Sequence, residues 1–281
     1  MQVATSDGLV VGCAFGHHAR MPDCDIHPTA VIHPQAELEA GVEVGAYAVI
    51  GADVRIGAGT IIGPHAVLEG PLRLGPRNHL AAHVTLGLPP QDDGYAGEAT
   101  ELVIGSDNRF REFFTAHRAS TKEDGVTRIG SHNLFMAYSH IGHDGRIGDR
   151  VTISNASQLA GHVQVDDRAY ISAVCGIHQF VRIGSLSMVG GGAVVTQDVA
   201  PYCTVTGNRA RLRGLNHRGL QRAGLDAGER RRIRQAYDLV FRRGLTREQA
   251  RQAISDDPGL ATPWVEALVA FMTDSNRGLV R

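Results

Sequence analysis

Aliphatic residues recur at every sixth position along most of this chain of 281 residues. A first run of eleven such positions begins at Ile26, and a second run of twelve apolar positions, eleven of them aliphatic, begins at Ile129. The first run is Ile26, Ile32, Leu38, Val44, Ile50, Ile56, Ile62, Leu68, Leu74, Leu80 and Leu86. The second is Ile129, Phe135, Ile141, Ile147, Ile153, Leu159, Val165, Ile171, Ile177, Ile183, Val189 and Val195.

A period of six is neither the 3.6 residues of a helix nor the simple alternation of a strand. It predicts a short strand, then a corner, repeated, with three faces closing a coil of about 18 residues and coils stacked about 4.8 Å apart. The aliphatic side chain points inward, and a small residue four positions later fits the corner. Glycine, which often follows the aliphatic residue, supplies the backbone angles of the corner. The number of repeats predicts about eight coils and a rod of about 35–40 Å.

The repeat is interrupted between residues 87 and 128, where only Ile104 and Phe110 fit it as isolated positions. Polar stretches rich in glycine and proline predict protruding loops at about 88–102 and 118–127. After residue 208 the pattern becomes helical, with a capping-box start at Thr246 and proline after the N-cap Thr262. We therefore expect a loosely ordered extension at 1–24, a β-helix at 25–208 and a helical domain at 209–281.

Composition excludes two classes of protein and leaves one question open. Hydrophobic residues make up 43% of the chain, which excludes a disordered protein. No apolar run is long enough for a membrane span. Residues 1–204 carry a net charge of −8 and residues 205–281 carry +7. The basic tail fits either an anionic partner, such as a nucleotide or an acidic protein, or a solvated helix face. No nucleic-acid partner is expected.

Cysteine usage predicts the compartment. The four cysteines are Cys13, Cys24, Cys175 and Cys203; they are widely spaced and form no CxxC motif. They therefore predict neither a disulfide framework nor a zinc ribbon, and they fit a reducing, cytoplasmic location. The start of the chain lacks the features of an export signal.

Histidine carries the candidate chemistry. His140, His143, His162 and His178 fall in the second run, and about one coil separates His143 from His162 and His162 from His178. These side chains, with His140, are expected to line one groove. His143 is followed by Asp144, a base beside an orienting carboxylate. Two functions fit the row: general-base catalysis at a thioester, and zinc binding as in β-helical carbonic anhydrases.

Five separated motifs resemble one family, the UDP-N-acetylglucosamine O-acyltransferases of lipid A biosynthesis. The resemblance runs from about Asp25 to the end of the chain. The motifs are Gln91–Glu98, Ser139–Asp144, Leu159–Val163, Ile177–Phe180 and Gly207–Asn208, followed by Gly214–Asn216, Gly219–Arg222 and Arg277–Arg281.

The resemblance implies transfer of a (R)-3-hydroxyacyl chain from acyl carrier protein to the 3-hydroxyl of the sugar nucleotide. It implies His143 as general base, Asp144 as its orienting group and the Gly161 amide as oxyanion donor. It also implies a homotrimer with sites between subunits, and no metal or other cofactor. The substrate-binding positions it implies are Gln91, Asp92, Met136, His140 and His162 for the sugar, Gln179, Asn216 and Arg222 for the nucleotide, and His178 and Gly191 for the acyl chain.

Several residues depart from the family pattern on the nucleotide side. Gly94 stands where the family typically has lysine, Arg218 where it has an acidic residue, and Ala223 where a second arginine is common. Arg209 replaces a histidine near the end of the acyl chain. These departures leave open a related acceptor, including a 3-amino UDP-sugar, and the zinc hydratase stays as a second alternative.

Overall fold

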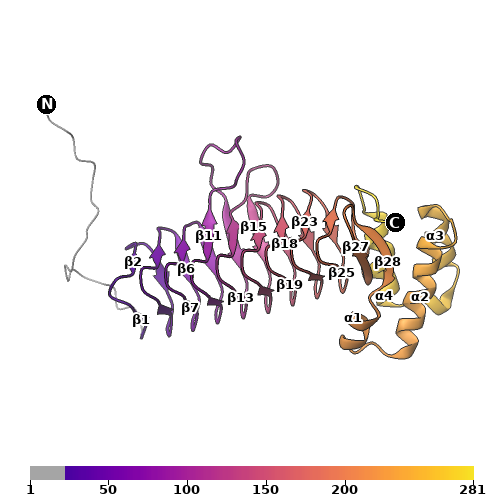
Figure 1. The fold of residues 1–281 in the computed structure, drawn as a ribbon, viewed down its shortest axis with the longest axis horizontal. Coiled ribbons are helices and arrows are strands. Elements are labelled where there is room, and N and C mark those ends of the chain that lie inside the picture. The colour runs from indigo at the N-terminus through magenta and orange to yellow at the C-terminus, as the bar shows by residue number, and fades with distance from the viewer. Residues whose placement is uncertain (1–22) are drawn as a thin grey trace.

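The computed structural model describes residues 23–281, so all but the end of the extension expected at 1–24 lies outside the described residues. The chain forms a long rod of stacked coils, and the C-terminal helices gather at one end of it (Figure 1). Two loops project from the same side of the rod near its middle (Figure 1).

The strands form three sheets, one for each face of the rod. The first sheet contains β1 (Asp25–Ile26), β4 (Glu43–Val44), β7 (Ile61–Ile62), β10 (His79–Leu80), β13 (Arg109–Phe110), β16 (Leu134–Phe135), β19 (Thr152–Ile153), β22 (Tyr170–Ile171), β25 (Met188–Val189), β27 (Cys203–Thr206) and β28 (Arg211–Leu215). The second contains β2 (Val31–Ile32), β5 (Val49–Ile50), β8 (Val67–Leu68), β11 (Thr85–Leu88), β14 (Thr115–His117), β17 (His140–Ile141), β20 (Gln158–Leu159), β23 (Gly176–Ile177) and β26 (Val194–Val195). The third contains β3 (Glu37–Leu38), β6 (Val54–Ile56), β9 (Leu72–Leu74), β12 (Glu101–Ile104), β15 (Val126–Ile129), β18 (Arg146–Ile147), β21 (Gln164–Val165) and β24 (Arg182–Ile183).

The six-residue repeat sets the register between coils. Parallel pairing places Ile26 beside Val44, Val44 beside Ile62 and Ile141 beside Leu159, each one coil along the chain. Each aliphatic residue therefore stacks on its equivalent in the next coil, and the column is buried except at the start of the rod, where Ile26 and Ile32 are partly buried. The period of six is explained because one strand and one corner together use one repeat.

The coil at residues 101–117 is complete, although the sequence pattern showed only two isolated repeats there. Leu74 pairs with Ile104, Leu80 with Phe110 and Leu86 with Ala116. One loop is inserted between β11 and β12 and the other between β14 and β15. These insertions change the spacing of the repeat along the sequence, but the coils on either side still stack on one another. The repeat was hidden because the second loop follows this coil directly.

Glycine at the corners has a different role from the one expected. The positive backbone angle lies three residues after the buried aliphatic residue, where non-glycine side chains commonly occupy it, as at Tyr47 and His65. The glycine that directly follows the aliphatic residue is needed because the next coil lies close. A Cβ at Gly63 would come within 2.6 Å of the Leu80 carbonyl oxygen. The small residues one position after the positive angle, such as Ala48, are fully buried as expected.

The C-terminal part begins with a strand rather than a helix. β28 pairs antiparallel with β27 and is followed by α1 (His217–Arg222), α2 (Ala227–Phe241), α3 (Arg247–Ser255), a 3-10 turn η1 (Pro258–Leu260) and α4 (Pro263–Thr273). Thr246 and Gln249 form the expected capping box, and Thr262 caps α4 ahead of its first residue, Pro263. No helix of the described residues is long and apolar enough to cross a membrane.

Candidate active site

One corner column positions the central residues of the site. Asp144, His162 and Phe180 occupy equivalent places in three successive coils, at the corner between the second and third sheets. All three have positive φ, of 58°, 62° and 63°. The His162 ring stacks on Phe180 with ring centroids 4.2 Å apart, and its Nε2 lies 3.7 Å from Asp144 Oδ2. The repeat itself therefore brings residues 18 positions apart into contact.

His143 and Asp144 form a hydrogen-bonded pair at this corner. Nδ1 of His143 lies 2.7 Å from Asp144 Oδ2, and the Asp144 side chain is 1% exposed against 16% for His143. Ser120 donates to the same oxygen from its amide (3.1 Å) and its hydroxyl (2.7 Å). Burial alone would raise the pKa of Asp144, but the hydrogen bonds from His143 and Ser120 outweigh it and hold this pKa below its ordinary value. Asp144 is thus an anion that fixes the imidazole.

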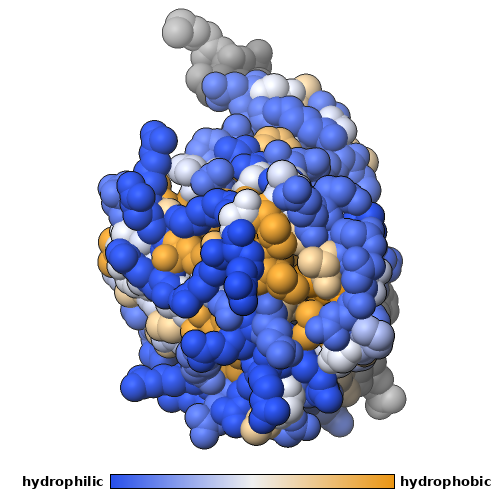
Figure 2. Space-filling model, turned by 90° about the vertical axis from the view of Figure 1, so that its right-hand side faces the viewer, coloured by the Kyte–Doolittle hydropathy of each residue, from blue (hydrophilic) through white to orange (hydrophobic). Residues whose placement is uncertain are grey.

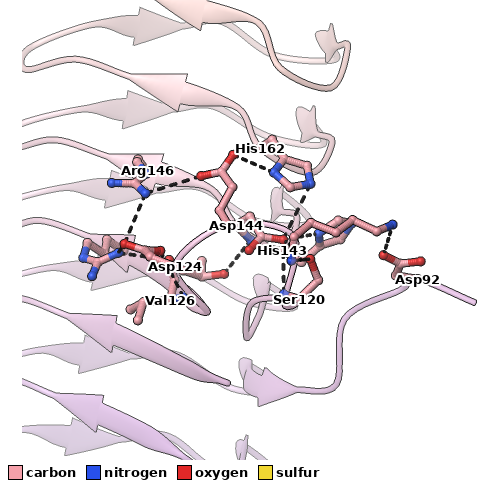
Figure 3. A network of polar contacts seen from close by, with 12 residues as sticks. Asp92, Ser120, Asp124, Val126, His143, Asp144, Arg146 and His162 are labelled. Carbon is pink, nitrogen blue, oxygen red and sulfur yellow. Dashed lines mark hydrogen bonds and ion pairs between the residues drawn. The ribbon is translucent and has the colours of Figure 1, made fainter. Parts of the chain in front are cut away.

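The loop between β14 and β15 supplies most partners of this pair (Figure 3). Ser120 comes from this loop, and Thr127 of β15, directly after it, accepts a hydrogen bond from the Asp144 amide at 2.8 Å. Lys122, the only lysine of the chain, pairs with Asp92 of the other loop. This ion pair holds the pKa of Asp92 below its usual range, chiefly through the hydrogen bond from Lys122. The two loops are therefore tied together next to the corner that holds His143 and Asp144.

A groove of about 520 Å³ runs over the outer face of the second sheet beside this corner. The predicted residues that line it are Gln91, His140, His143, Gly161, His178 and Gln179. His117 also lines it and meets His140 edge to face, with ring centroids 5.1 Å apart. Burial, with the neighbouring His117 and His143, lowers the pKa of His140 to about 4, so this ring is neutral at pH 7.

Gly161 presents a free backbone donor under His143. Its amide donates no hydrogen bond to any acceptor among residues 23–281. In each coil, the backbone amide two positions after the buried aliphatic residue has no backbone acceptor. Proline, which has no amide hydrogen, is therefore tolerated at this position, as at Pro28, Pro64 and Pro76. At Gly161 this unpaired amide lies close to the imidazole of His143. A Cβ on Gly161 would come within 2.6 Å of that ring.

Other predicted residues lie elsewhere on the chain. Met136 and Gly191 lie at the corner between the first and second sheets. Asn216 and Arg222 line a separate groove of about 870 Å³ over the first sheet, together with Arg150, Arg168 and Arg218. His162 is 4% exposed and lies behind the groove rather than along its wall. A single chain therefore brings together the His143 half of the predicted site but not the nucleotide half.

Sequence reasoning missed Ser120, Glu123 and Thr127 as partners of the corner that holds His143, Asp144 and His162. Ser120 and Glu123 belong to a loop without a repeat, so no periodicity placed them, and Thr127 lies in β15 just before the second run begins at Ile129. Glu123 accepts from His162 Nδ1 at 2.8 Å. His117 could have been found, because it stands one strand before His140 in the same sheet.

His143, Asp144 and His162 are also the set of described residues that could hold a metal ion, with ligand atoms within 4.8 Å of one another. Two imidazoles and a carboxylate suit zinc in kind. In this structure, however, Asp144 Oδ2 already has three hydrogen-bond donors, and Glu123 occupies His162 Nδ1. Asp144 Oδ1 is buried without a partner, but Asp144 Oδ2 and the Nδ1 atoms of both histidines are hydrogen-bonded, which fits a base and its orienting carboxylate better than a metal centre.

A three-sided β-helix with a histidine–carboxylate pair in a surface groove defines the class of hexapeptide-repeat acyltransferases. Residues 198–280 match the family model described as "Udp N-acetylglucosamine O-acyltransferase; Domain 2". The acyl-[acyl-carrier-protein]–UDP-N-acetylglucosamine O-acyltransferase of Verminephrobacter eiseniae is 46% identical over 92% of this chain and 99% of its own length. The enzyme of that name from Halorhodospira halophila is 45% identical over 91% and 99%.

Solved structures agree in fold. The UDP-N-acetylglucosamine acyltransferase of Francisella novicida superposes with a TM-score of 0.88 at 35% identity, covering 91% of this chain and 94% of that one. The O-acyltransferase of Moraxella catarrhalis gives 0.88 at 37%, covering 91% and 99%. The chain belongs to the UDP-N-acetylglucosamine O-acyltransferase family, and the predicted left-handed parallel β-helix with C-terminal helices is confirmed.

Proposed function

We propose that this chain transfers a (R)-3-hydroxyacyl group from acyl carrier protein to the 3-hydroxyl of UDP-N-acetylglucosamine, the first step of lipid A biosynthesis. Membership of the family supports the reaction and both substrates. The observation that carries the mechanism is the His143–Asp144 pair. His143 lines the groove, and its Nδ1 lies 2.7 Å from Asp144 Oδ2. A pair built this way leaves Nε2 of His143 available to act on a substrate.

In this proposal His143 is the general base. Ionised Asp144 accepts from Nδ1–H, so Nε2 of the neutral ring carries the lone pair. Nε2 takes the proton of the sugar hydroxyl as its oxygen attacks the thioester carbonyl. The carbon–sulfur bond then breaks, and the imidazolium returns the proton to the departing thiolate. No covalent acyl-enzyme and no metal or other cofactor enters the scheme.

The Gly161 amide serves as donor to the oxyanion that forms in the tetrahedral intermediate. Its amide is already without an acceptor among the described residues and lies beside the base. A donor held by a stacked coil needs no reorganisation when charge develops, and one such donor is typically worth about 10²–10³ in kcat. This assigns the proton transfer and the charge stabilisation to neighbouring coils.

The remaining substrate contacts are proposed as follows. Gln91, Asp92, Met136, His140 and His162 position the sugar, Gln179, Asn216 and Arg222 the nucleotide, and His178 and Gly191 the acyl chain. Because Asn216 and Arg222 line a different face of the chain from His143, one chain cannot supply both halves of the site. We therefore propose a homotrimer in which the nucleotide half comes from a neighbouring subunit.

The proposed docking surface for acyl carrier protein is the arginine-rich part of the helical end. In α2 and just beyond it, Arg231, Arg234 and Arg243 are exposed, and no carboxylate of the described residues pairs with them. Figure 2 looks at this end of the molecule, which is mostly hydrophilic. An acidic carrier would be attracted here. As part of the proposal the enzyme works in the cytoplasm, because Cys175 and Cys203 are buried thiols rather than a disulfide.

The test is an assay of purified protein with a panel of acyl carrier protein thioesters and UDP-sugars, followed by mass spectrometry of the products. The proposal predicts an O-acylated UDP-N-acetylglucosamine. A product formed only with a 3-amino UDP-sugar would instead support the alternative acceptor, for which the departures at Gly94, Arg218 and Ala223 leave room. The same panel reports the chain length that the groove accepts.

A further inference from the structure

Glu123 connects the loop between β14 and β15 to the back of the active site. Its Oε1 lies 2.8 Å from Nδ1 of His162, and its Oε2 lies 3.3 Å from a guanidinium nitrogen of Arg146. His162 is almost completely buried, between Phe180 on one side and the His143–Asp144 pair on the other. Figure 3 shows His162 and Arg146 flanking this network. No residue role discussed above accounts for this carboxylate.

The contact determines where the proton of His162 sits. An ionised carboxylate only accepts hydrogen bonds, so the nitrogen that faces Glu123 must carry hydrogen. In the neutral ring Nε2 is then bare. Nε2 lies 3.7 Å from Asp144 Oδ2, which is longer than a hydrogen bond and is what two acceptors would show. His162 in this form gives Asp144 no donor.

The consequence concerns His143. Asp144 Oδ2 accepts from His143 Nδ1 and twice from Ser120. If the proton of His162 moved to Nε2, that nitrogen would become a fourth donor next to the same oxygen. It would then compete with His143, whose orientation depends on this bond. Keeping the His162 proton on Nδ1 removes the competitor.

We infer that Glu123 is a positioning residue, which holds the His162 proton on Nδ1 and so reserves Asp144 for His143. Glu123 touches none of the reacting atoms and acts through His162. The inference deepens the proposed function, on which its kinetic part rests, by adding a second histidine–carboxylate pair behind the first.

The adjacent Asp124 supplies a matched control. It lies in the same loop and pairs with the same Arg146 at 3.2 Å, and with Arg128 at 2.7 Å. No histidine contact of Asp124 is present among the described residues. If Glu123 merely anchored the loop, replacement of Asp124 would have a comparable effect.

The kinetic test is a double-mutant cycle. Glu123→Ala is expected to lower kcat by roughly 10- to 100-fold with little change in KM, because misplacement of a reacting group by about 1 Å costs up to about 100-fold. Asp124→Ala is expected to stay within about threefold of the parent. In a His162→Phe background, where the ring has no proton to misplace, Glu123→Ala is expected to have no further effect. Equal losses in both backgrounds, or equal losses for the two loop variants, would overturn the inference.

A second measurement does not depend on activity. Nitrogen-15 NMR of the histidine rings at neutral pH is expected to show His162 protonated on Nδ1 and bare on Nε2 in the parent protein. The proton is expected to move at least partly to Nε2 in Glu123→Ala. A parent ring protonated on Nε2 would overturn the inference, even if acyl transfer is confirmed. Conversely, the expected tautomer in a protein without acyl transfer would leave the inference standing and remove the proposed function.

Discussion

Gly161 lies directly against the imidazole of His143, so close that a methyl group on Gly161 would come within 2.6 Å of Cε1 and Nε2 of the ring. The two residues come from successive coils, one strand apart in the second sheet. Because Gly161 has no side chain, the His143 ring can occupy this position. The Gly161 amide, which donates no hydrogen bond to the described residues, lies next to the ring.

Gly161→Ala is therefore expected to displace His143 and to lower kcat by about 100-fold while the coil stays folded. Steady-state kinetics and a thermal melt measure the two effects separately. Gly176→Ala is the matched control, because it lies in the same groove and a Cβ there meets nothing within 4 Å. Near-parent activity in Gly161→Ala would show that the ring has room to move without loss.

The sequence predicted the rod well because each repeat makes the same contacts as the one before it. Ile141 must stack on Leu159, and their spacing alone says so. The repeat also predicted that His143 and His162 would meet, because they follow those two residues. It could not show that His162 lies behind the groove, since that depends on Phe180 and on Glu123.

The six-residue repeat could not predict the contacts that the loops make, or which face of the rod the residues after it would line. Ser120 reaches Asp144 from a segment without periodicity. Asn216 and Arg222 follow the rod, and no spacing indicated that they would line a different face from His143. The prediction that the glycine after each aliphatic residue supplies the corner angles was wrong. That glycine is needed because the next coil approaches closely, and this approach depends on how the coils stack, which one repeat does not show.

His140 should make stability fall in mild acid. Its pKa is about 4 in the folded protein and about 6.5 when exposed, so the unfolded chain takes up a proton first as the pH falls. The contribution is therefore complete above about pH 6.5 and is lost between pH 6.5 and 4, by on the order of 3 kcal/mol. Chemical denaturation across this range should show a smaller loss for His140→Gln than for the parent. Parallel curves would contradict the assignment.

Subunit sharing of the site predicts complementation. His143→Ala alone, and the double replacement of Asn216 and Arg222 by alanine alone, should each show little activity. In a random equal mixture of co-assembled chains, about a quarter of the sites should combine an intact His143 with an intact nucleotide half. Recovery of about that fraction of parent activity is expected. No recovery in trimers verified to be mixed would place each complete site on one chain.

Metal removal distinguishes the transferase from the hydratase alternative. Asp144 Oδ2 accepts hydrogen bonds from His143 and Ser120, and Nδ1 of His162 contacts Glu123, so part of the possible ligand set is engaged within the protein. Acyl transfer is therefore expected to survive chelation and dialysis, with far less than one zinc per chain by elemental analysis. Stoichiometric zinc, together with activity lost on chelation and restored by zinc, would favour a metal centre.

The most direct test is the rate of acyl transfer to UDP-N-acetylglucosamine by His143→Ala, compared with the parent protein at equal folded concentration. General-base catalysis typically contributes about 10²–10⁴-fold, so kcat should fall by at least 100-fold while the melting temperature and the oligomeric state stay those of the parent. A folded His143→Ala protein that keeps most of the parent kcat would contradict the account.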